Sequence, residues 1–194
     1  DVFCEEGYFD VKQSQKILET AKSYDLIPRI HADEFKYFGA SELAAEIGAI
    51  SADHLMMIND KGINAIAKSG TVATLLPGTT FFLNEKEYAN GRKLIDKNCK
   101  VAIASDFNPG TCTIRSLSNI MFLAMQNCGL SFNESFLGIT YNAALALGKE
   151  KNIGLVKENY NADMIFWNID SIDEIPYWFD SSSSKIFKVI KNGK

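Results

Sequence analysis

Short apolar runs alternate with amphipathic segments from the start of the chain to about residue 128. The apolar runs have the length of strands, and the amphipathic segments carry apolar residues at helical spacing. Continuously apolar strands joined by helices are typical of a parallel sheet covered on both faces. The pattern predicts an α/β fold with strands at Asp1–Cys4, Ile27–Ile30, Ala49–Ala52, Thr71–Leu76 and Lys100–Ser105.

Helices are predicted between these strands. Leu43, Ala44 and Ile47 form one apolar side of such a helix, and Ser41 is placed to cap its first turn. Five strands joined in this way fit either an open doubly wound sheet or the later part of a (β/α)8 barrel. The predicted helices are Val11–Tyr24, Ser41–Ile47, Lys61–Lys68, Glu85–Lys97 and Ile114–Asn127.

The pattern changes after Asn127. Two short helices are followed, beyond Gly148, by segments that alternate like antiparallel strands. We therefore expect a domain boundary near Gly148, with a larger unit at residues 1–148 and a smaller one at 149–194. The elements predicted here are helices Phe132–Leu137 and Asn142–Leu147, strands Ala162–Trp167 and Ile186–Ile190, and a loop at Ser181–Ser184.

Composition narrows the class of protein. With 46% hydrophobic and 23% charged residues, the chain has the make-up of an ordinary folded protein. A net charge of −4 without any basic block argues against a nucleic-acid partner. No apolar run approaches the roughly 20 residues of a membrane span. The four scattered cysteines lack CxxC pairing and are expected to be reduced, mostly buried thiols of a cytoplasmic protein.

Polar residues with catalytic potential recur where predicted strands end. His31 follows one strand, His54 follows the next, and Asp106 follows the last. The carboxyl ends of parallel barrel strands line the active face, so these side chains are expected at one rim. Such a set suits metal binding, general-base chemistry, or both.

A simpler interpretation exists for each residue taken alone. A histidine after a strand is commonly a hydrogen-bonded loop residue, and Asp106-Phe107-Asn108-Pro109-Gly110 has the composition of a turn. Recurrence at three strand ends favours the functional interpretation. The residues by themselves thus indicate a metal-assisted or acid–base enzyme on a parallel α/β scaffold.

Four motifs around these positions carry a family resemblance. They are His31-Ala32-Asp33-Glu34, Ser51-Ala52-Asp53-His54-Leu55, Leu75-Leu76-Pro77-Gly78-Thr79 and Ser105-Asp106-Phe107-Asn108-Pro109-Gly110. In this order they resemble the imidazolonepropionases of the amidohydrolase superfamily, and the resemblance extends over essentially the whole chain. It implies strands four to eight of a (β/α)8 TIM barrel, followed by part of a small β-sandwich.

The resemblance also implies an activity. The family hydrolyses the cyclic amide of 4-imidazolone-5-propanoate to N-formimidoyl-L-glutamate during histidine degradation, with one zinc or iron ion. Transferred to matching positions, His31 and Asp106 would be metal ligands, and Asp106 would also accept a proton from water. His54 would stabilise the oxyanion, Glu34 would hold the ring N–H and shuttle a proton, and the loop residues Asn108, Gly110 and Thr111 would bind the propanoate arm. Cys4, Glu5 and Thr79 lie nearby without an assigned role.

The chain departs from the family pattern in one important respect. It has no His-x-His pair, which supplies the family's first two metal ligands, and a catalytic zinc usually has three protein ligands or more. The chain also begins in mid-strand, so we expect residues to be missing upstream. We predict that this polypeptide alone is inactive and binds metal weakly. We also expect it to form a homo-oligomer, or to associate with a companion chain, through its exposed barrel edges. A smaller departure is the apolar Leu55-Met56-Met57 after His54.

Two other functions stay open at this stage. Aromatic-base deaminases of the same superfamily also place a glutamate three residues after the strand-five histidine, so Glu34 does not separate them, whereas Asn108-Pro109-Gly110 favours the imidazolonepropionases. A non-catalytic remnant of the scaffold is the alternative from another class. The presence of His31, His54 and Asp106 argues against it.

Overall fold

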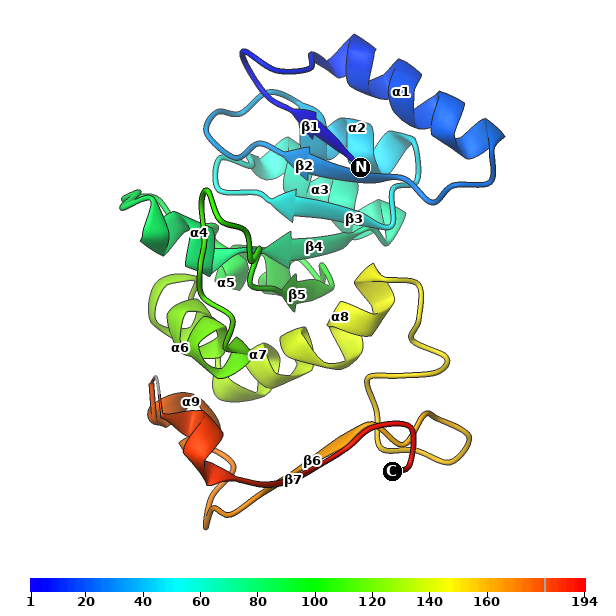
Figure 1. The fold of residues 1–194 in the computed structure, drawn as a ribbon. Coiled ribbons are helices and arrows are strands. Elements are labelled where there is room, and N and C mark those ends of the chain that lie inside the picture. Colours follow the sequence, from blue (N-terminus) through cyan, green and yellow to red (C-terminus); the bar gives the residue numbers. More distant parts are fainter. Residues whose placement is uncertain (180) are drawn as a thin grey trace.

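The computed structural model describes residues 1–179 and 181–194, and its centre is one parallel sheet (Figure 1). The strands lie side by side in the order of the sequence, and each pairs with the next in parallel. A doubly wound sheet reverses its strand order at a switch point, whereas successive units of a barrel do not. The sheet consists of β1 (Val2–Cys4), β2 (Arg29–Ala32), β3 (Ser51–His54), β4 (Val72–Leu75) and β5 (Val101–Ile103).

Helices follow every strand of this sheet. Several begin with the side-chain caps that their sequences encode: Asp10 caps α1, Asn59 caps α3 and Ser116 caps α6. The helices are α1 (Val11–Ser23), α2 (Ala40–Glu46), α3 (Asp60–Ser69), α4 (Pro77–Phe82), α5 (Gly91–Asp96), α6 (Leu117–Asn127), α7 (Phe132–Ile139) and α8 (Tyr141–Ala146).

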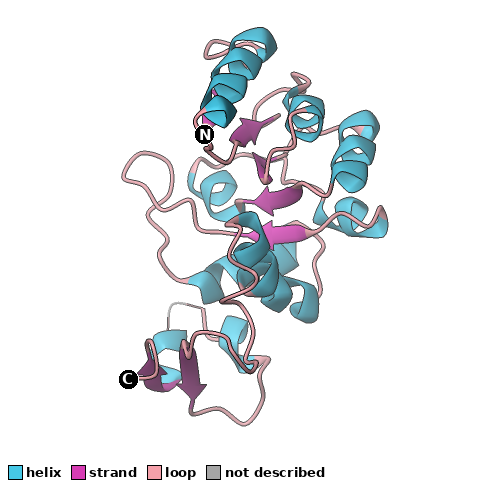
Figure 2. Ribbon diagram, turned by 90° about the vertical axis from the view of Figure 1, so that its right-hand side faces the viewer, coloured by secondary structure: helices cyan, strands magenta, loops and turns pink. Residues whose placement is uncertain are grey.

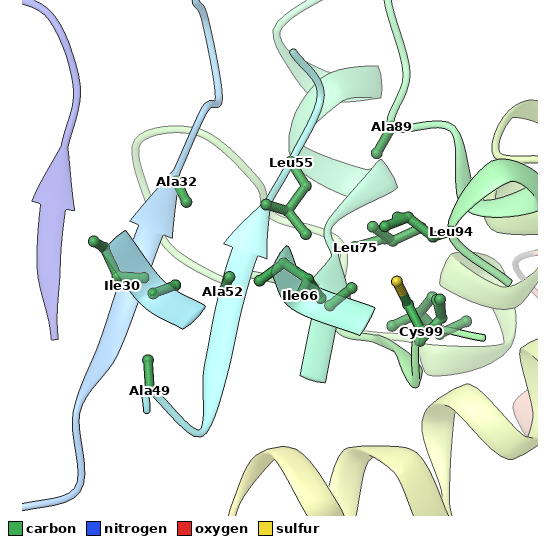
Figure 3. Packing of buried hydrophobic residues seen from close by; sticks show 14 of the residues in the cluster. Ile30, Ala32, Ala49, Ala52, Leu55, Ile66, Leu75, Ala89, Leu94 and Cys99 are labelled. Atoms are coloured by element: carbon green, nitrogen blue, oxygen red, sulfur yellow. The ribbon is translucent and has the colours of Figure 1, made fainter. Parts of the chain in front are cut away.

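One face of the sheet forms the main core. Ile30 of β2 and Ala52 of β3 share a buried cluster with Ile66 of α3 (Figure 3). Burying a side chain of this size contributes roughly 1.5–3 kcal/mol. Successive residues of a strand point to opposite faces, so the residues between these apolar ones are directed to the other side.

The second face is partly polar. His31 pairs in register with Asp53, and Asp53 pairs with Thr74. On the same face, Val72 of β4 and Ala102 of β5 pack with Ala146 of α8. The apolar runs of the sequence suggested strands with two similar faces, but the structure separates a hydrophobic face from one that carries polar side chains towards the site.

Several predicted boundaries were displaced. His31 lies inside β2 and His54 is the last residue of β3, because both strands run further than their apolar runs indicate. The helix predicted at Glu85–Lys97 is confined to Gly91–Asp96, where Asn90 caps it. The helix α4, which was not predicted, starts with Pro77 at its first position, where a missing N–H costs nothing.

The predicted cap of α2 was also wrong. Ser41 is a buried residue inside the helix, and Gly39 is the residue before its first turn, without a side-chain cap of its own. The free N–H groups of this helix start are instead satisfied by the carboxylate of Asp33, which accepts hydrogen bonds from Ala40 and Ser41 at 3.2 Å. This capping residue lies too far back in the sequence for a local pattern to reveal it.

The C-terminal part forms a separate two-stranded sheet (Figures 1 and 2). As predicted, β6 (Met164–Trp167) and β7 (Ile186–Ile190) pair in antiparallel fashion. Between them lie α9 (Glu174–Tyr177) and a 3-10 helix at Ser182–Lys185, where a loop was expected. The division into units at 1–148 and 149–194 remains a prediction.

All four cysteines are buried and unpaired, as expected for small hydrophobic side chains. Burial raises the pKa of the Cys99 thiol to about 11 and that of Cys128 to about 12, so both stay protonated at neutral pH. Within residues 1–179 and 181–194, no helix is long and apolar enough to cross a membrane.

Candidate active site

The carboxyl ends of β2 and β3 bring two histidines together. The ring centroids of His31 and His54 are 5.1 Å apart. The backbone at His54 has a φ of +75°, and Leu55 follows at +60°, a conformation that side chains with a Cβ rarely adopt. Strain of this kind is often found where a side chain is held in a functional position. The predicted convergence of these two residues is therefore present.

Glu34 lies against His54 of this pair. Its Oε1 is 3.3 Å from Nδ1 of His54, an ion-pair distance without the alignment of a hydrogen bond. Burial raises the pKa of Glu34 to about 7, with His31 opposing the shift and Asp106 adding to it. Burial lowers the pKa of His54 to about 3, and His31 contributes in the same direction. The pair at neutral pH is thus a neutral imidazole beside a carboxyl group that can gain or lose a proton.

Asp106 belongs to the loop after β5, and its φ of +50° is one that aspartate tolerates. The hydroxyl of Thr79, at the start of α4, donates a hydrogen bond of 2.7 Å to its Oδ2. His31 lies near the end of β2, Glu34 follows β2 and Asp106 follows β5, so all three are at the carboxyl end of the parallel sheet. Thr79 is a member of this group to which the sequence assigned no role.

The loop after Asp106 is organised by Asn108. Its Oδ1 accepts the N–H groups of Gly110 and Thr111 at 2.8 Å, and its Nδ2 donates to the carbonyl of Asp106 and to the hydroxyl of Thr111. The side-chain amide of Asn108 therefore forms its hydrogen bonds with groups of its own loop. The backbone donors expected to bind a substrate arm are already engaged by Asn108, so such binding would have to share or displace these hydrogen bonds.

Two acidic residues also lie close to His31. Nδ1 of His31 is 3.1 Å from a carboxylate oxygen of Asp1, and ligand atoms of Asp1, His31 and Asp53 lie within 4.8 Å of one another. Asp53 is buried and 3.5 Å from Arg29, and its Oδ1 has no hydrogen-bond partner in the described chain. Sequence reasoning missed both acids. The alternation along β3, with His54 as the assigned residue, gave no reason to examine its neighbour.

The residues offer an incomplete ligand set for a metal ion. His31 and Asp106 provide one imidazole nitrogen and one carboxylate, donors that suit zinc and iron. In the part of the chain that the structure describes, no third ligand closes a compact group with both of them, because the one compact group of potential ligands is Asp1, His31 and Asp53. The donor chemistry fits, and the number of ligands is short of the usual three.

A hollow of about 230 Å³ lies elsewhere, lined by residues that include Ile50, Thr71 and Lys100. These residues precede β3, β4 and β5, so the hollow is at the amino ends of the strands. The active sites of barrel enzymes lie at the opposite end, where the strands have their carboxyl ends. The hollow is therefore separate from the candidate site.

Comparison with known proteins assigns the scaffold. The model of the amidohydrolase family matches residues 11–194, and the chain belongs to this family. The imidazolonepropionase of Kosmotoga olearia is 46% identical over the whole chain, and that of Bacillus thuringiensis is 42% identical over the whole chain. A zinc-bound adenosine deaminase from Xanthomonas campestris has the same fold, with a TM-score of 0.76 over 96% of this chain and 49% of its own, at 15% identity.

The chain spans about half the length of the curated relatives, 47% and 45% of the two named above. Together with the sequential parallel sheet, the structural match confirms the predicted α/β fold as part of a (β/α)8 barrel and rules out the doubly wound alternative. The resemblance to imidazolonepropionases is confirmed as well.

Proposed function

We propose that the protein carrying this chain hydrolyses 4-imidazolone-5-propanoate to N-formimidoyl-L-glutamate. The identity of 46% to an imidazolonepropionase over all 194 residues supports this substrate. The observation that carries the proposal is the placement of Glu34 beside a neutral His54, 3.3 Å apart, next to His31. A cyclic amide needs a donor for its carbonyl oxygen and a proton carrier for its ring nitrogen, and this pair provides both.

A divalent ion, zinc or iron, is part of the proposal. His31 and Asp106 would hold it, with further ligands from outside the 194 residues. Bound there, the ion would make a water molecule acidic enough to attack at neutral pH. The donor types support this assignment, and an adenosine deaminase of the same fold carries zinc.

Three residues of the chain carry out the proton transfers and stabilise the developing charge. Asp106 accepts a proton from the attacking water, whose oxygen forms a bond to the carbonyl carbon. His54 donates a hydrogen bond to the carbonyl oxygen as negative charge develops there. When the ring C–N bond breaks, Glu34 passes a proton to the departing nitrogen, which balances the proton taken by Asp106. A Glu34 pKa of about 7 matches such a transfer at neutral pH.

The propanoate arm is assigned to the loop of Asn108, Gly110 and Thr111. Asn108 holds this loop in place through four hydrogen bonds, and the N–H groups of Gly110 and Thr111 would share their bonds to Asn108 with the propanoate carboxylate. The four free cysteines support a cytoplasmic location, where thiols remain reduced.

The first test compares the full natural-length protein with His31→Ala and Asp106→Ala. We expect loss of bound metal, measured by elemental analysis, and a fall in kcat of roughly 10²-fold or more. Near-normal turnover in either variant would contradict the mechanism. Asp163→Ala is a matched control, because Asp163 lies directly before β6 and pairs with Lys191 outside the candidate site, so it should leave metal content and turnover unchanged.

A panel of substrates separates the remaining alternative. An aromatic-base deaminase would also use a glutamate beside a histidine, and the shared fold with an adenosine deaminase at 15% identity says nothing about substrate. Turnover of guanine or cytosine in place of imidazolonepropanoate would replace our proposal by deamination. The absence of turnover with every substrate, despite bound metal, would point to a non-catalytic scaffold.

A further inference from the structure

Glu5 is a buried carboxylate held entirely by backbone groups. It follows β1 and is only 2% exposed. Its Oε2 accepts hydrogen bonds from the N–H groups of Glu34 at 3.1 Å, Phe35 at 3.0 Å and Lys36 at 3.5 Å, and its Oε1 accepts that of Glu6 at 3.0 Å. In the described chain no ion pair includes Glu5. Burying a charge without a counter-ion is costly, so an acid at this position requires a reason.

The side chain of Glu5 is not needed to close the loop between β1 and α1. This loop is closed by its own backbone hydrogen bonds, from Glu5 N–H to the Phe9 carbonyl, from Tyr8 N–H to the Glu5 carbonyl, and from Phe9 N–H to the Phe3 carbonyl. Three of the four N–H groups that the Glu5 side chain accepts belong to a different segment, the turn that carries Glu34. The carboxylate therefore acts between elements.

Asp33 fixes the same turn from its other side. Its side chain is fully buried and accepts the N–H groups of Phe38 at 2.8 Å and of Ala40 and Ser41 at 3.2 Å. Its carbonyl accepts the N–H of Met57 at 2.9 Å, which ties the turn to the segment after β3 and His54. The backbone of Glu34 is thus held between two anchored neighbours, while its own carboxyl group is left to face His54.

We propose that Glu5 is the positioning residue of Glu34: by accepting the N–H groups of Glu34 and Phe35, it holds the Glu34 carboxyl group against the His54 ring. The inference rests on the proposed hydrolysis, in which Glu34 carries the proton to the ring nitrogen. Glutamine at this position would have one carbonyl oxygen for the turn, and its NH₂ group would face the N–H of Glu6, donor against donor. The turn would then be held only by an uncharged amide oxygen, next to a repulsive contact at Glu6, so its hold would weaken while the side-chain volume stays the same.

A double-mutant cycle on the full natural-length, metal-loaded protein tests this. Glu5→Gln, Glu34→Gln and the double variant are compared in imidazolonepropanoate hydrolysis. A misplaced catalytic group costs rate more than binding, so we expect Glu5→Gln to lower kcat by about tenfold or more with a smaller change in KM. In the Glu34→Gln background the same change should cost less than about twofold. Glu5→Asp, which keeps the charge but is one methylene shorter, should recover part of the lost kcat.

Asp10→Asn provides the matched control. Asp10 is also an acid that accepts a backbone N–H, that of Gln13 at 2.8 Å, but it caps α1 and is exposed. It should leave kcat unchanged in both backgrounds. Equal, multiplicative losses from Glu5→Gln with and without Glu34 would overturn the positioning role and leave Glu5 as a purely structural acid.

Failure of the two proposals can be told apart. If the parent protein does not hydrolyse the substrate, the proposed function is wrong. If it does and the cycle is multiplicative, only the role of Glu5 is wrong. If Glu5→Gln does not fold, as judged by circular dichroism, the cycle is carried out with Glu5→Asp. The fall in kcat caused by Glu5→Asp should again be smaller in the Glu34→Gln background. Equal falls in both backgrounds would overturn the positioning role.

Discussion

Burial at residue scale sets the chemistry of the Glu34–His54 pair. Both groups are removed from water, which disfavours the charged form of each and moves their pKa values in opposite directions, to about 7 for the carboxyl and about 3 for the imidazole. An isolated pair in water would instead ionise to a carboxylate and, below pH 6.5, an imidazolium. The enclosed position thus favours a neutral imidazole and a carboxyl group that titrates near neutral pH, which are the properties that the proposed mechanism needs.

The raised pKa of Glu34 predicts that replacing this residue increases stability at high pH and lowers activity. The folded state holds its proton up to about pH 7, whereas the unfolded chain releases it near pH 4.5, so stability is lost as pH rises between these values. Glu34→Gln should therefore be as stable as the parent near pH 4 and more stable at pH 8, by at most about 3 kcal/mol, while losing roughly 10²-fold or more in kcat. Urea unfolding of the metal-free protein at both pH values, with turnover assays, checks this. A variant that is less stable than the parent at pH 8 would contradict it.

At the scale of elements, local capping signals explain where helices begin, and contacts between segments explain the exceptions. Asp10 and Ser131 form capping boxes with Gln13 and Glu134, which a sequence pattern can reveal. The start of α2 is capped by Asp33, which belongs to the turn after β2. The segment at residues 85–90 has helical composition, yet the helix starts only after Asn90, because this side chain caps Lys93.

The cap of α7 leads to a prediction about pH. Arg92 forms two hydrogen bonds to Glu134, and together with the Ser131 N–H and hydroxyl they lower the pKa of Glu134 to about 2. The stabilisation is present above the unfolded pKa near 4.5 and is lost as pH falls towards 2. Glu134→Ala should cost about 1 kcal/mol at pH 7, discounted because the pair is partly exposed, and almost nothing at pH 2. Thermal or urea unfolding across this range measures it, and a cost independent of pH would refute the assignment.

At the scale of the whole molecule, the sheet has two unpaired edges, β1 and β5, in the described chain. The C-terminal pair of strands also exposes large apolar side chains, with Phe187 79% and Val189 57% exposed. Unpaired edges and contiguous apolar surfaces favour association. The homologous relatives are about twice as long, so such surfaces have chain available to cover them in those proteins.

We predict that the 194-residue polypeptide studied by itself associates in solution, binds little zinc or iron, and does not hydrolyse imidazolonepropanoate. Unsatisfied edges drive the association, and two ligands are too few for tight metal binding. Light scattering over a concentration series, elemental analysis and a turnover assay test the three parts. A monodisperse monomer at high concentration, or turnover at the level of the full natural-length protein, would contradict the prediction.

The sequence by itself determined the parallel α/β scaffold, its family and the antiparallel strands near the C-terminus, because hydrophobic periodicity and contiguous motifs are local features. It also indicated that His31 and His54 meet, because neighbouring parallel strands end at the same edge. Only the tertiary structure decided which groups surround them. The capping of α2 by Asp33, the hold of Glu5 on the Glu34 turn, the contact of Thr79 with Asp106 and the acids next to His31 join residues from separate elements. These contacts depend on strand register and on the depth of burial, which no local pattern specifies.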